Sequence, residues 1–256
     1  MNRQEKIISI RKKLNNSEPS IGTWMQIPSP DIAEILSYSN YDWIAVDLEH
    51  GSIMANDLPS IFRAIESSGC TLPLARISHL SAQACKAALD AGAGGVIVPK
   101  VESALDIKTL RDFSCWPPTG QRGVGFSRAN LFGKKFTEYQ IEAQNPILVA
   151  MIESVNGVKN LDEILELEYL DAIFIGPYDL SASMGITGDF NNKIFLDTIS
   201  EINEKCLKHK KANGIHIVEN SPTLLNDAIN RGYQFIAYAL DGVFLNSATM
   251  NPQQEY

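Results

Sequence analysis

Four ionisable side chains follow apolar runs of the sequence at positions where they could share one site. His50 lies in AVDLEHG, Arg76 in LPLARI, Glu153 at the end of ILVAMIE and Asp179 in GPYDLS. Carboxylate oxygens are hard ligands that suit Mg²⁺ or Mn²⁺ better than a structural zinc ion, and water or substrate oxygens can complete the coordination shell. We therefore expect Glu153 and Asp179 to hold one divalent cation.

His50 and Arg76 would supply acid–base chemistry and positive charge beside that cation. Asp47 precedes His50 by three residues, close enough for its carboxylate to orient the imidazole as a base. Arg76 ends an otherwise apolar run, where a guanidinium needs an anion such as a substrate carboxylate or an enolate. A permanent ion pair between Arg76 and Asp47 or Glu49 is the alternative interpretation.

Three further features leave their roles open. Lys100, in VPKV, could form a Schiff base with a ketone and make the enzyme independent of metal, or it could be a solvated or ion-paired side chain. His216 could face either the interior of a barrel or its helices. The irregular stretch 115–145 contains Arg122 and Arg128 and could bind an anion, cover an active site or contact another subunit.

The elements that would position these residues alternate between short β-type runs and amphipathic helical segments. We predict strands at 20–26, 42–48, 72–77, 95–101, 147–153, 172–176, 213–218 and 234–240. Eight such units favour an α/β fold of the (β/α)₈ TIM barrel type, with residues 1–256 as a single domain. A doubly wound open sheet is the alternative. In a barrel, all the candidate residues would meet at the C-terminal ends of the strands.

Composition excludes several other classes. The net charge of −8 disfavours nucleic acid and anionic membranes as partners, and no apolar run is long enough to span a membrane. The N-terminus is expected to form a short polar helix and not a signal peptide. The four cysteines show no CxxC spacing, which suits a reducing, cytoplasmic setting.

From about residue 20 to 245 the chain resembles the HpcH/HpaI family of class II pyruvate aldolases. The resemblance is carried by IGTWMQIPSPDIAEILSYSNYDWIAVDLEHG, PLARI, GAGGVIVPKV, GQRGVGFSRANLFG, VAMIES and IFIGPYDLSASMG. It implies a barrel of the phosphoenolpyruvate/pyruvate type, with Glu153 and Asp179 as ligands of Mg²⁺, Mn²⁺ or Co²⁺. It also implies catalytic roles for His50, Arg76 and Asp47, and a homo-oligomer, typically a hexamer built as a trimer of dimers.

The expected reaction is cleavage of a 4-hydroxy-2-oxo acid to pyruvate and an aldehyde through a metal-stabilised pyruvate enolate, in the breakdown of aromatic compounds or sugar acids. Besides Arg76, the substrate would contact Gly176, Pro177, Tyr178 and Met151. Met151 stands where well-studied members have Gln, and Lys100 where an apolar residue is usual. The alternatives are a related carbon–carbon condensing enzyme, either citrate-synthase-like or similar to phosphoenolpyruvate mutase and isocitrate lyase, or a binding protein without turnover.

Overall fold

Eight parallel strands close into a barrel in the computed structural model, which describes residues 2–249. Each strand pairs with its sequence neighbours, and β8 returns to pair with β1. The strands are β1 (Ser20–Met25), β2 (Trp43–Asp47), β3 (Leu72–Arg76), β4 (Gly95–Val98), β5 (Ile147–Ile152), β6 (Ala172–Ile175), β7 (Gly214–Ile217) and β8 (Phe235–Leu240). The TIM barrel prediction is confirmed, the open sheet is excluded, and the predicted strands differ only at their ends.

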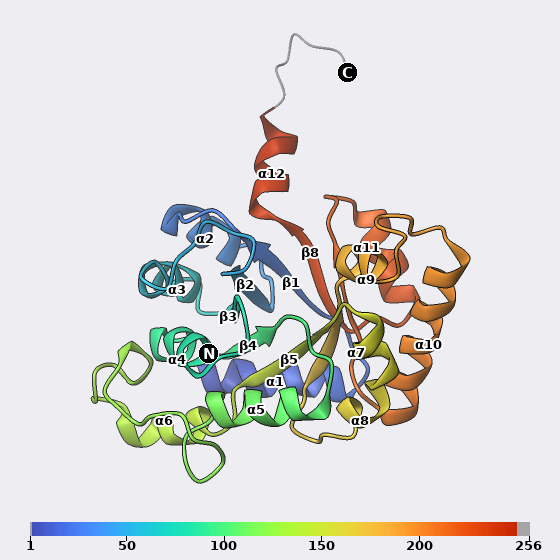
Figure 1. The fold of residues 1–256 in the computed structure, drawn as a ribbon. Helices are drawn as coiled ribbons and strands as arrows, with labels where there is room; N and C mark the ends of the chain where they lie inside the picture. Colours follow the sequence, from blue (N-terminus) through green and yellow to red (C-terminus); the bar gives the residue numbers. More distant parts are fainter. Residues whose placement is uncertain (1, 250–256) are drawn as a thin grey trace.

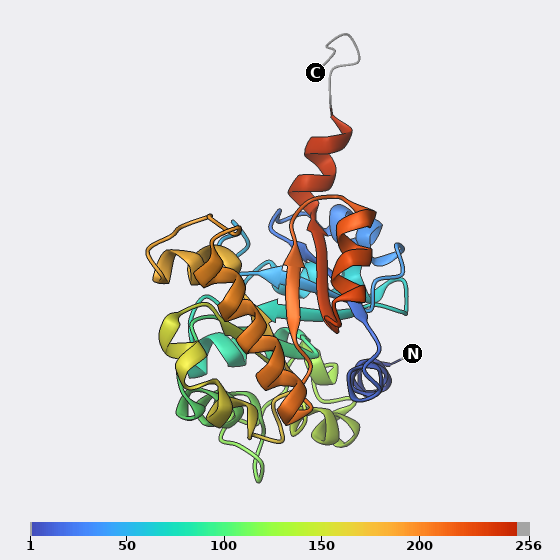
Figure 2. The same cartoon turned by 90° about the vertical axis from the view of Figure 1, so that its right-hand side faces the viewer.

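Helices surround the barrel (Figure 1). They are α2 (Pro30–Ser37), α3 (Leu58–Glu66), α4 (Ala82–Ala91), α5 (Ala104–Ser114), α7 (Val155–Lys159), α8 (Leu161–Leu165), α9 (Pro177–Ser183), α10 (Lys193–His209) and α11 (Pro222–Asn230). Several begin at a Ser whose hydroxyl accepts a hydrogen bond from the first turn, as Ser81 and Ser103 do. Helix α12 (Asp241–Ala248) instead stands out from the barrel beyond β8 (Figures 1 and 2). Within residues 2–249 no helix is long and apolar enough to cross a membrane.

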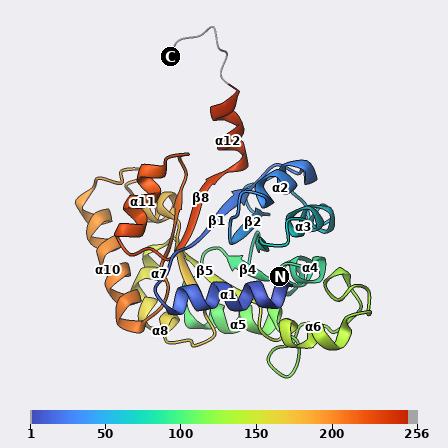
Figure 3. The same cartoon turned by 180° about the vertical axis from the view of Figure 1, so that it is seen from behind.

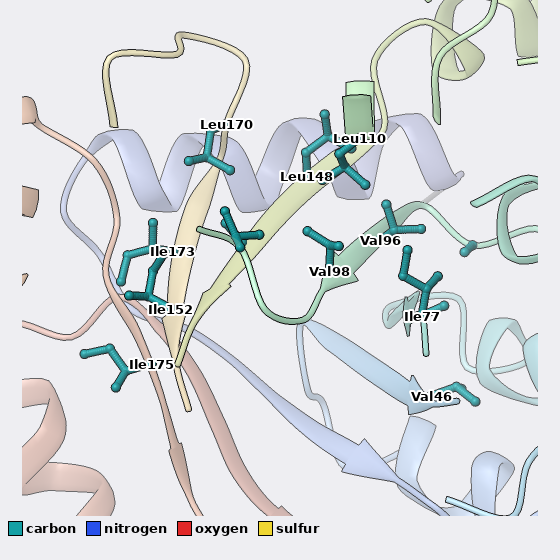
Figure 4. Packing of buried hydrophobic residues seen from close by; sticks show 14 of the residues in the cluster. Val46, Ile77, Val96, Val98, Leu110, Leu148, Ile152, Leu170, Ile173 and Ile175 are labelled. Atoms are coloured by element: carbon teal, nitrogen blue, oxygen red, sulfur yellow. The ribbon is translucent and has the colours of Figure 1, made fainter. Parts of the chain in front are cut away.

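The alternation of side chains along each strand divides the core into two layers. Outward residues such as Val46, Val98 and Ile173 pack between the strands and the helices (Figure 4). Inward residues fill the barrel, where Trp43 stacks on Phe235 with 4.2 Å between the ring centroids. The same alternation turns the last inward residue of each strand toward the C-terminal mouth of the barrel.

Helix α1 (Arg3–Asn15) closes the opposite end of the barrel (Figure 3). Its buried residues Ile7, Ile10 and Leu14 belong to the same cluster as the inward side chains. The Lys6 ammonium donates to the Thr71 carbonyl at 2.8 Å. The helix is therefore not simply polar, as the sequence suggested, because one face of it completes the core.

The irregular stretch 115–145 connects α5 to β5 and contains a 3₁₀ turn, η1 (Arg128–Asn130), and α6 (Phe136–Ala143). It lies at the end of the barrel closed by α1, since Arg3 bonds to Glu142 and to the Ala129 carbonyl. It cannot cover the mouth of its own barrel. Arg122 pairs with Asp90 and Arg128 with Glu66, so neither guanidinium is available as an anion site.

Close packing around Trp43 gives a stability prediction. A Cβ added to Gly22 would lie 2.1 Å from Cδ2 of the fully buried Trp43. Gly22→Ala is therefore expected to lower the free energy of unfolding by about 1–3 kcal/mol, the usual range for overpacking. Urea denaturation measures the change. The control is Gly125→Ala, where no atom lies within 4 Å of the new Cβ, and which should change stability by about 0.5 kcal/mol or less. A Gly22→Ala protein as stable as the parent would contradict this account of the packing.

Candidate active site

A cavity of about 230 Å³ opens at the C-terminal mouth of the barrel. Most of the sequence-predicted site residues line it, namely His50, Arg76, Met151, Gly176, Pro177, Tyr178 and Asp179. Trp24, Gln26 and His216 line it as well. Two other cavities, of about 240 and 520 Å³, lie beside α1 and contain none of these residues. The mouth is therefore the candidate active site.

The Asp47 carboxylate, at the end of β2, organises one side of this mouth. It is fully buried and accepts hydrogen bonds from Arg76, from the Gln26 side chain at 2.7 Å, and from the backbone N–H groups of Glu49 and His50. Burial alone would raise the pKa of Asp47, but the hydrogen bonds and charge of Arg76 and the Gln26 bond lower it below its ordinary value. Asp47 is thus an ionised carboxylate at the mouth.

This arrangement corrects the expected role of Asp47. Its carboxylate bonds to the backbone N–H of His50, at 3.2 Å, and to no atom of the imidazole. The carboxylate that lies nearest the ring is that of Glu49, with 4.0 Å between Oε2 and Nε2 of His50. Asp47 therefore fixes the backbone that carries His50, and the imidazole itself is largely exposed, at 58% of its side-chain surface.

Arg76 ends β3 beside Asp47, with which it is in register. Its guanidinium forms a two-pronged pair with Asp47, lies 4.5 Å from the centroid of the Trp24 ring, and has Nη1 3.5 Å from Glu49. The ion pair considered as an alternative is therefore present. Nη1 also lies 3.9 Å from the Met151 sulfur, on the cavity wall, so this edge of the guanidinium faces the space for a ligand.

Glu153 directly follows β5 and is only 4% exposed. Its Oε1 accepts a hydrogen bond of 2.7 Å from the backbone N–H of Lys100. A Cβ on Gly176 would meet Oε2 at 2.6 Å, so the absence of a side chain there leaves room for the carboxylate. Burial raises the pKa of Glu153 to about 7, and the charges of Glu49 and Asp179 add to the increase despite the Lys100 bond.

Four carboxylates, those of Asp47, Glu49, Glu153 and Asp179, share this mouth with one guanidinium. Neither Glu153 nor Asp179 takes part in an ion pair among residues 2–249. The donor set therefore fits a hard divalent cation, which would offset the burial and the neighbouring negative charges that raise the pKa of Glu153. In the described part of the chain, no three His, Cys, Asp or Glu side chains are placed to hold a metal ion together. Water or substrate oxygens would have to complete the shell.

Lys100 contributes its backbone and not its amine. Its side chain is exposed, and its φ of +55° turns the N–H toward Glu153. A lysine that forms a Schiff base near neutral pH normally needs a desolvated amine or a neighbouring cation, and the exposed position supplies no such burial. The structure thus gives no support to the Schiff-base alternative.

Sequence reasoning missed Trp24 and Gln26, and it left His216 unassigned. Their signal was the alternation along the strands. Trp24 lies on the inward face of β1, and Gln26, just after the strand, continues the same alternation. Position 216 shares its phase with the glycine at 214, which leaves space beside Phe174. Gln26 is further held by Asp241, whose carboxylate accepts its backbone N–H at 3.0 Å.

Comparison with known proteins places the whole site within one family. The model of the HpcH/HpaI aldolase/citrate lyase family matches residues 20–248. The chain belongs to this family. Every residue assigned to the mouth lies inside the matched range, and the resemblance noted from the sequence is confirmed.

Individual members of the HpcH/HpaI family are similar to this chain over nearly its full length. A 4-hydroxy-2-oxovalerate aldolase from Novosphingobium aromaticivorans is 30% identical, with 93% of this chain and 90% of that protein covered. A hydroxypyruvate/pyruvate aldolase from Roseobacter denitrificans is 33% identical, with 91% of each covered. The crystal structure of a family protein from Burkholderia cenocepacia superposes with a TM-score of 0.88 at 29% identity, covering 94% of this chain and 96% of that one.

The raised pKa of Glu153 predicts how stability depends on pH when no metal is bound. Because the folded-state pKa of about 7 lies above the ordinary 4.5, the folded protein holds this proton more tightly than the unfolded chain. Stability is then lost as pH rises from about 4.5 through 7. Glu153→Gln, which cannot ionise, should exceed the parent in unfolding free energy by roughly 1–3 kcal/mol at pH 8, and by much less at pH 5.

Urea denaturation in EDTA at the two pH values measures this difference. Glu34→Gln, at an exposed helix position, is the control and should show no pH-dependent gain. An equal effect of Glu153→Gln at pH 5 and pH 8 would mean that Glu153 is ionised throughout.

Proposed function

We propose that this chain is a divalent-metal-dependent aldolase that cleaves a 4-hydroxy-2-oxo acid to pyruvate and an aldehyde. The observation that carries the proposal is the excess of carboxylates at the mouth, where Asp179 and Arg76 line the cavity, Glu153 lies against Gly176 of the cavity wall, and neither Glu153 nor Asp179 has an ion-pair partner among residues 2–249. The aldolases among the relatives support the same class of reaction. Its small-molecule partners would be a 2-oxo acid and an aldehyde.

Glu153 and Asp179 would hold the cation, which we propose to be Mg²⁺, Mn²⁺ or Co²⁺. When bound, a divalent cation polarises the 2-oxo group of the substrate and offsets negative charge that develops there. The protein keeps the two carboxylates in place through the Lys100 N–H, which bonds to Glu153, and through helix α9, whose first turn contains Asp179.

The pyruvyl half of the substrate would bind between Arg76 and the first turn of α9. The Nη1 edge of Arg76 donates toward an oxygen of this half, where negative charge grows during cleavage. The N–H groups of Tyr178 and Asp179 lie in the first helical turn and have no acceptor within the helix, so they suit the substrate carboxylate. Pro177 has no N–H, so it would contact the substrate only through its ring or its other backbone atoms.

His50 would serve as the base. Its exposed imidazole removes the proton from the 4-hydroxyl group, the oxygen then forms the aldehyde carbonyl, and the C3–C4 bond breaks. The electron pair of that bond passes to the pyruvyl half beside Arg76, and a proton added at C3 gives pyruvate. Glu49, near the His50 ring, would favour the protonated imidazole that this step creates.

We also propose that the chain functions as a homo-oligomer, a hexamer by analogy with the family. Exposed apolar side chains support assembly, since Phe126 and Phe132 of the 115–145 stretch are 74% and 71% exposed. The projecting helix α12 offers a second contact, with Leu245 at 44% exposed. Large exposed apolar side chains at two separate places are consistent with contacts to other subunits.

Substitution of the carboxylates tests the proposed chemistry. Glu153→Ala or Asp179→Ala should lower kcat/KM for pyruvate release from 4-hydroxy-2-oxo acids by about 10³-fold or more, because the cation that stabilises developing charge would be lost. The assay couples pyruvate to its reduction by NADH, with Mn²⁺ or Mg²⁺ added. EDTA should abolish the activity of the parent protein to the same extent.

Lys100→Gly is the matched control for the competing chemistry. It keeps the N–H that bonds to Glu153 and relieves the positive φ, so activity within about threefold of the parent is expected. Loss of activity in this variant, or trapping of pyruvate on the protein by borohydride, would refute the metal-dependent mechanism in favour of a Schiff base.

A further inference from the structure

His216, on β7, lines the active-site cavity. Its ring centroid lies 5.9 Å from that of Trp24, and the apolar side chains of Phe174 and Leu240 line the same cavity, while the charges of Arg76 and Asp47 also act on the imidazole. A leucine would pack well in such surroundings. The presence of an imidazole at this position calls for a functional explanation, because burying a polar group costs free energy unless it is hydrogen-bonded.

The tautomer of His216 follows from its one hydrogen bond. Nε2 lies 3.0 Å from the Ala239 carbonyl oxygen, which can only accept, so Nε2 carries the proton. Burial lowers the pKa of His216 to about 4, so the ring is neutral at physiological pH. Nδ1 is therefore a bare acceptor. Among residues 2–249 no hydrogen bond reaches Nδ1, nor is this atom among the buried polar atoms that lack a partner.

The backbone at Ala239, whose carbonyl accepts this bond, has a φ of +51°. Few residues other than glycine adopt that conformation, and it lies within β8 beside a shift in the β1–β8 register. Such backbone outliers cluster at functional sites, where the surrounding structure maintains them. The irregularity places the carbonyl of Ala239 opposite His216 and leaves Nδ1 as the free edge of the ring.

An acceptor in this cavity restricts what the ligand must offer. The pyruvyl half of a 4-hydroxy-2-oxo acid has only acceptor oxygens, in its carboxylate and its 2-oxo group, so it cannot pair with Nδ1. The 4-hydroxyl proton is the one that His50 removes in the proposed mechanism. A substrate donor for Nδ1 would therefore lie in the remainder of the substrate, the part that leaves as the aldehyde.

We propose that His216 makes this enzyme selective for hydroxyaldehydes, with Nδ1 accepting a hydrogen bond from a hydroxyl group beyond the aldehyde carbon. This inference rests on the proposed aldolase function and narrows its substrate class. His216 is a specificity-determining residue that contacts the aldehyde-derived half and takes no part in the chemistry at C3 and C4. A cavity built to pair with a hydroxyl discriminates strongly against a substrate that lacks one.

The test compares two aldehydes of nearly the same size in condensation with pyruvate. Glycolaldehyde carries a hydroxyl where propanal carries a methyl group. The parent protein, assayed with Mn²⁺, should show kcat/KM at least about tenfold higher for glycolaldehyde. His216→Leu should reduce that preference to about threefold or less, mainly through a lower value for glycolaldehyde. His216→Asn, whose amide oxygen can stand near the former Nδ1, should recover part of the preference.

A separate readout distinguishes failure of this inference from failure of the proposed function. Exchange of the pyruvate C3 protons with D₂O, followed by NMR, involves the pyruvyl half alone and should persist in His216→Leu. A parent protein that condenses both aldehydes without preference, or a preference that survives His216→Leu with exchange intact, overturns the inference and leaves the aldolase standing. Absence of both exchange and condensation in the parent protein overturns the aldolase itself.

Discussion

The buried carboxylate of Asp47 is the interaction on which the geometry of the mouth depends. It joins three segments that are distant in sequence, because it accepts hydrogen bonds from Arg76 on β3, from Gln26 after β1 and from the backbone that leads to His50. An ionised carboxylate inside a protein is tolerated only when its oxygens are bonded in this way. The backbone of His50 and the guanidinium of Arg76 are thus held in a fixed relation by a residue that itself has no exposed surface.

Charge explains why the other half of the mouth is arranged differently. On the Asp47 side, the guanidinium balances the carboxylate within the protein. Around Glu153 and Asp179, the only hydrogen bond to a carboxylate that residues 2–249 supply from another element is the one from the Lys100 N–H. Under the proposed function, an external cation would balance the charge of that half. This arrangement suits a site in which Asp47 and Arg76 are positioned before a ligand binds. Glu153 and Asp179 then remain available to bind the ligand.

Much of this arrangement could be predicted from the sequence, and the reason is the regularity of a parallel barrel. Eight apolar runs of similar spacing were enough to predict the fold. The rule that site residues lie at the C-terminal ends of barrel strands predicted that Arg76, Glu153 and Asp179 would lie at one mouth. The rule does not say which side chains pair with one another. That Asp47 bonds to Arg76 and not to the His50 ring depends on loop conformation, which a local pattern does not encode. The role of Lys100 could not be predicted for the same reason. The site uses its backbone N–H, a group that every residue except proline carries, and its side chain is not what matters.

The barrel is closed at the end opposite the site, where the apolar face of α1 and the inward aromatic rings fill the space (Figure 3). A molecule that reaches the mouth has no exit through the barrel and must leave by the way it came. Both products of cleavage would then leave through the same opening by which the next substrate enters. When release is slower than bond cleavage, the fragment that departs more slowly would set the rate of turnover.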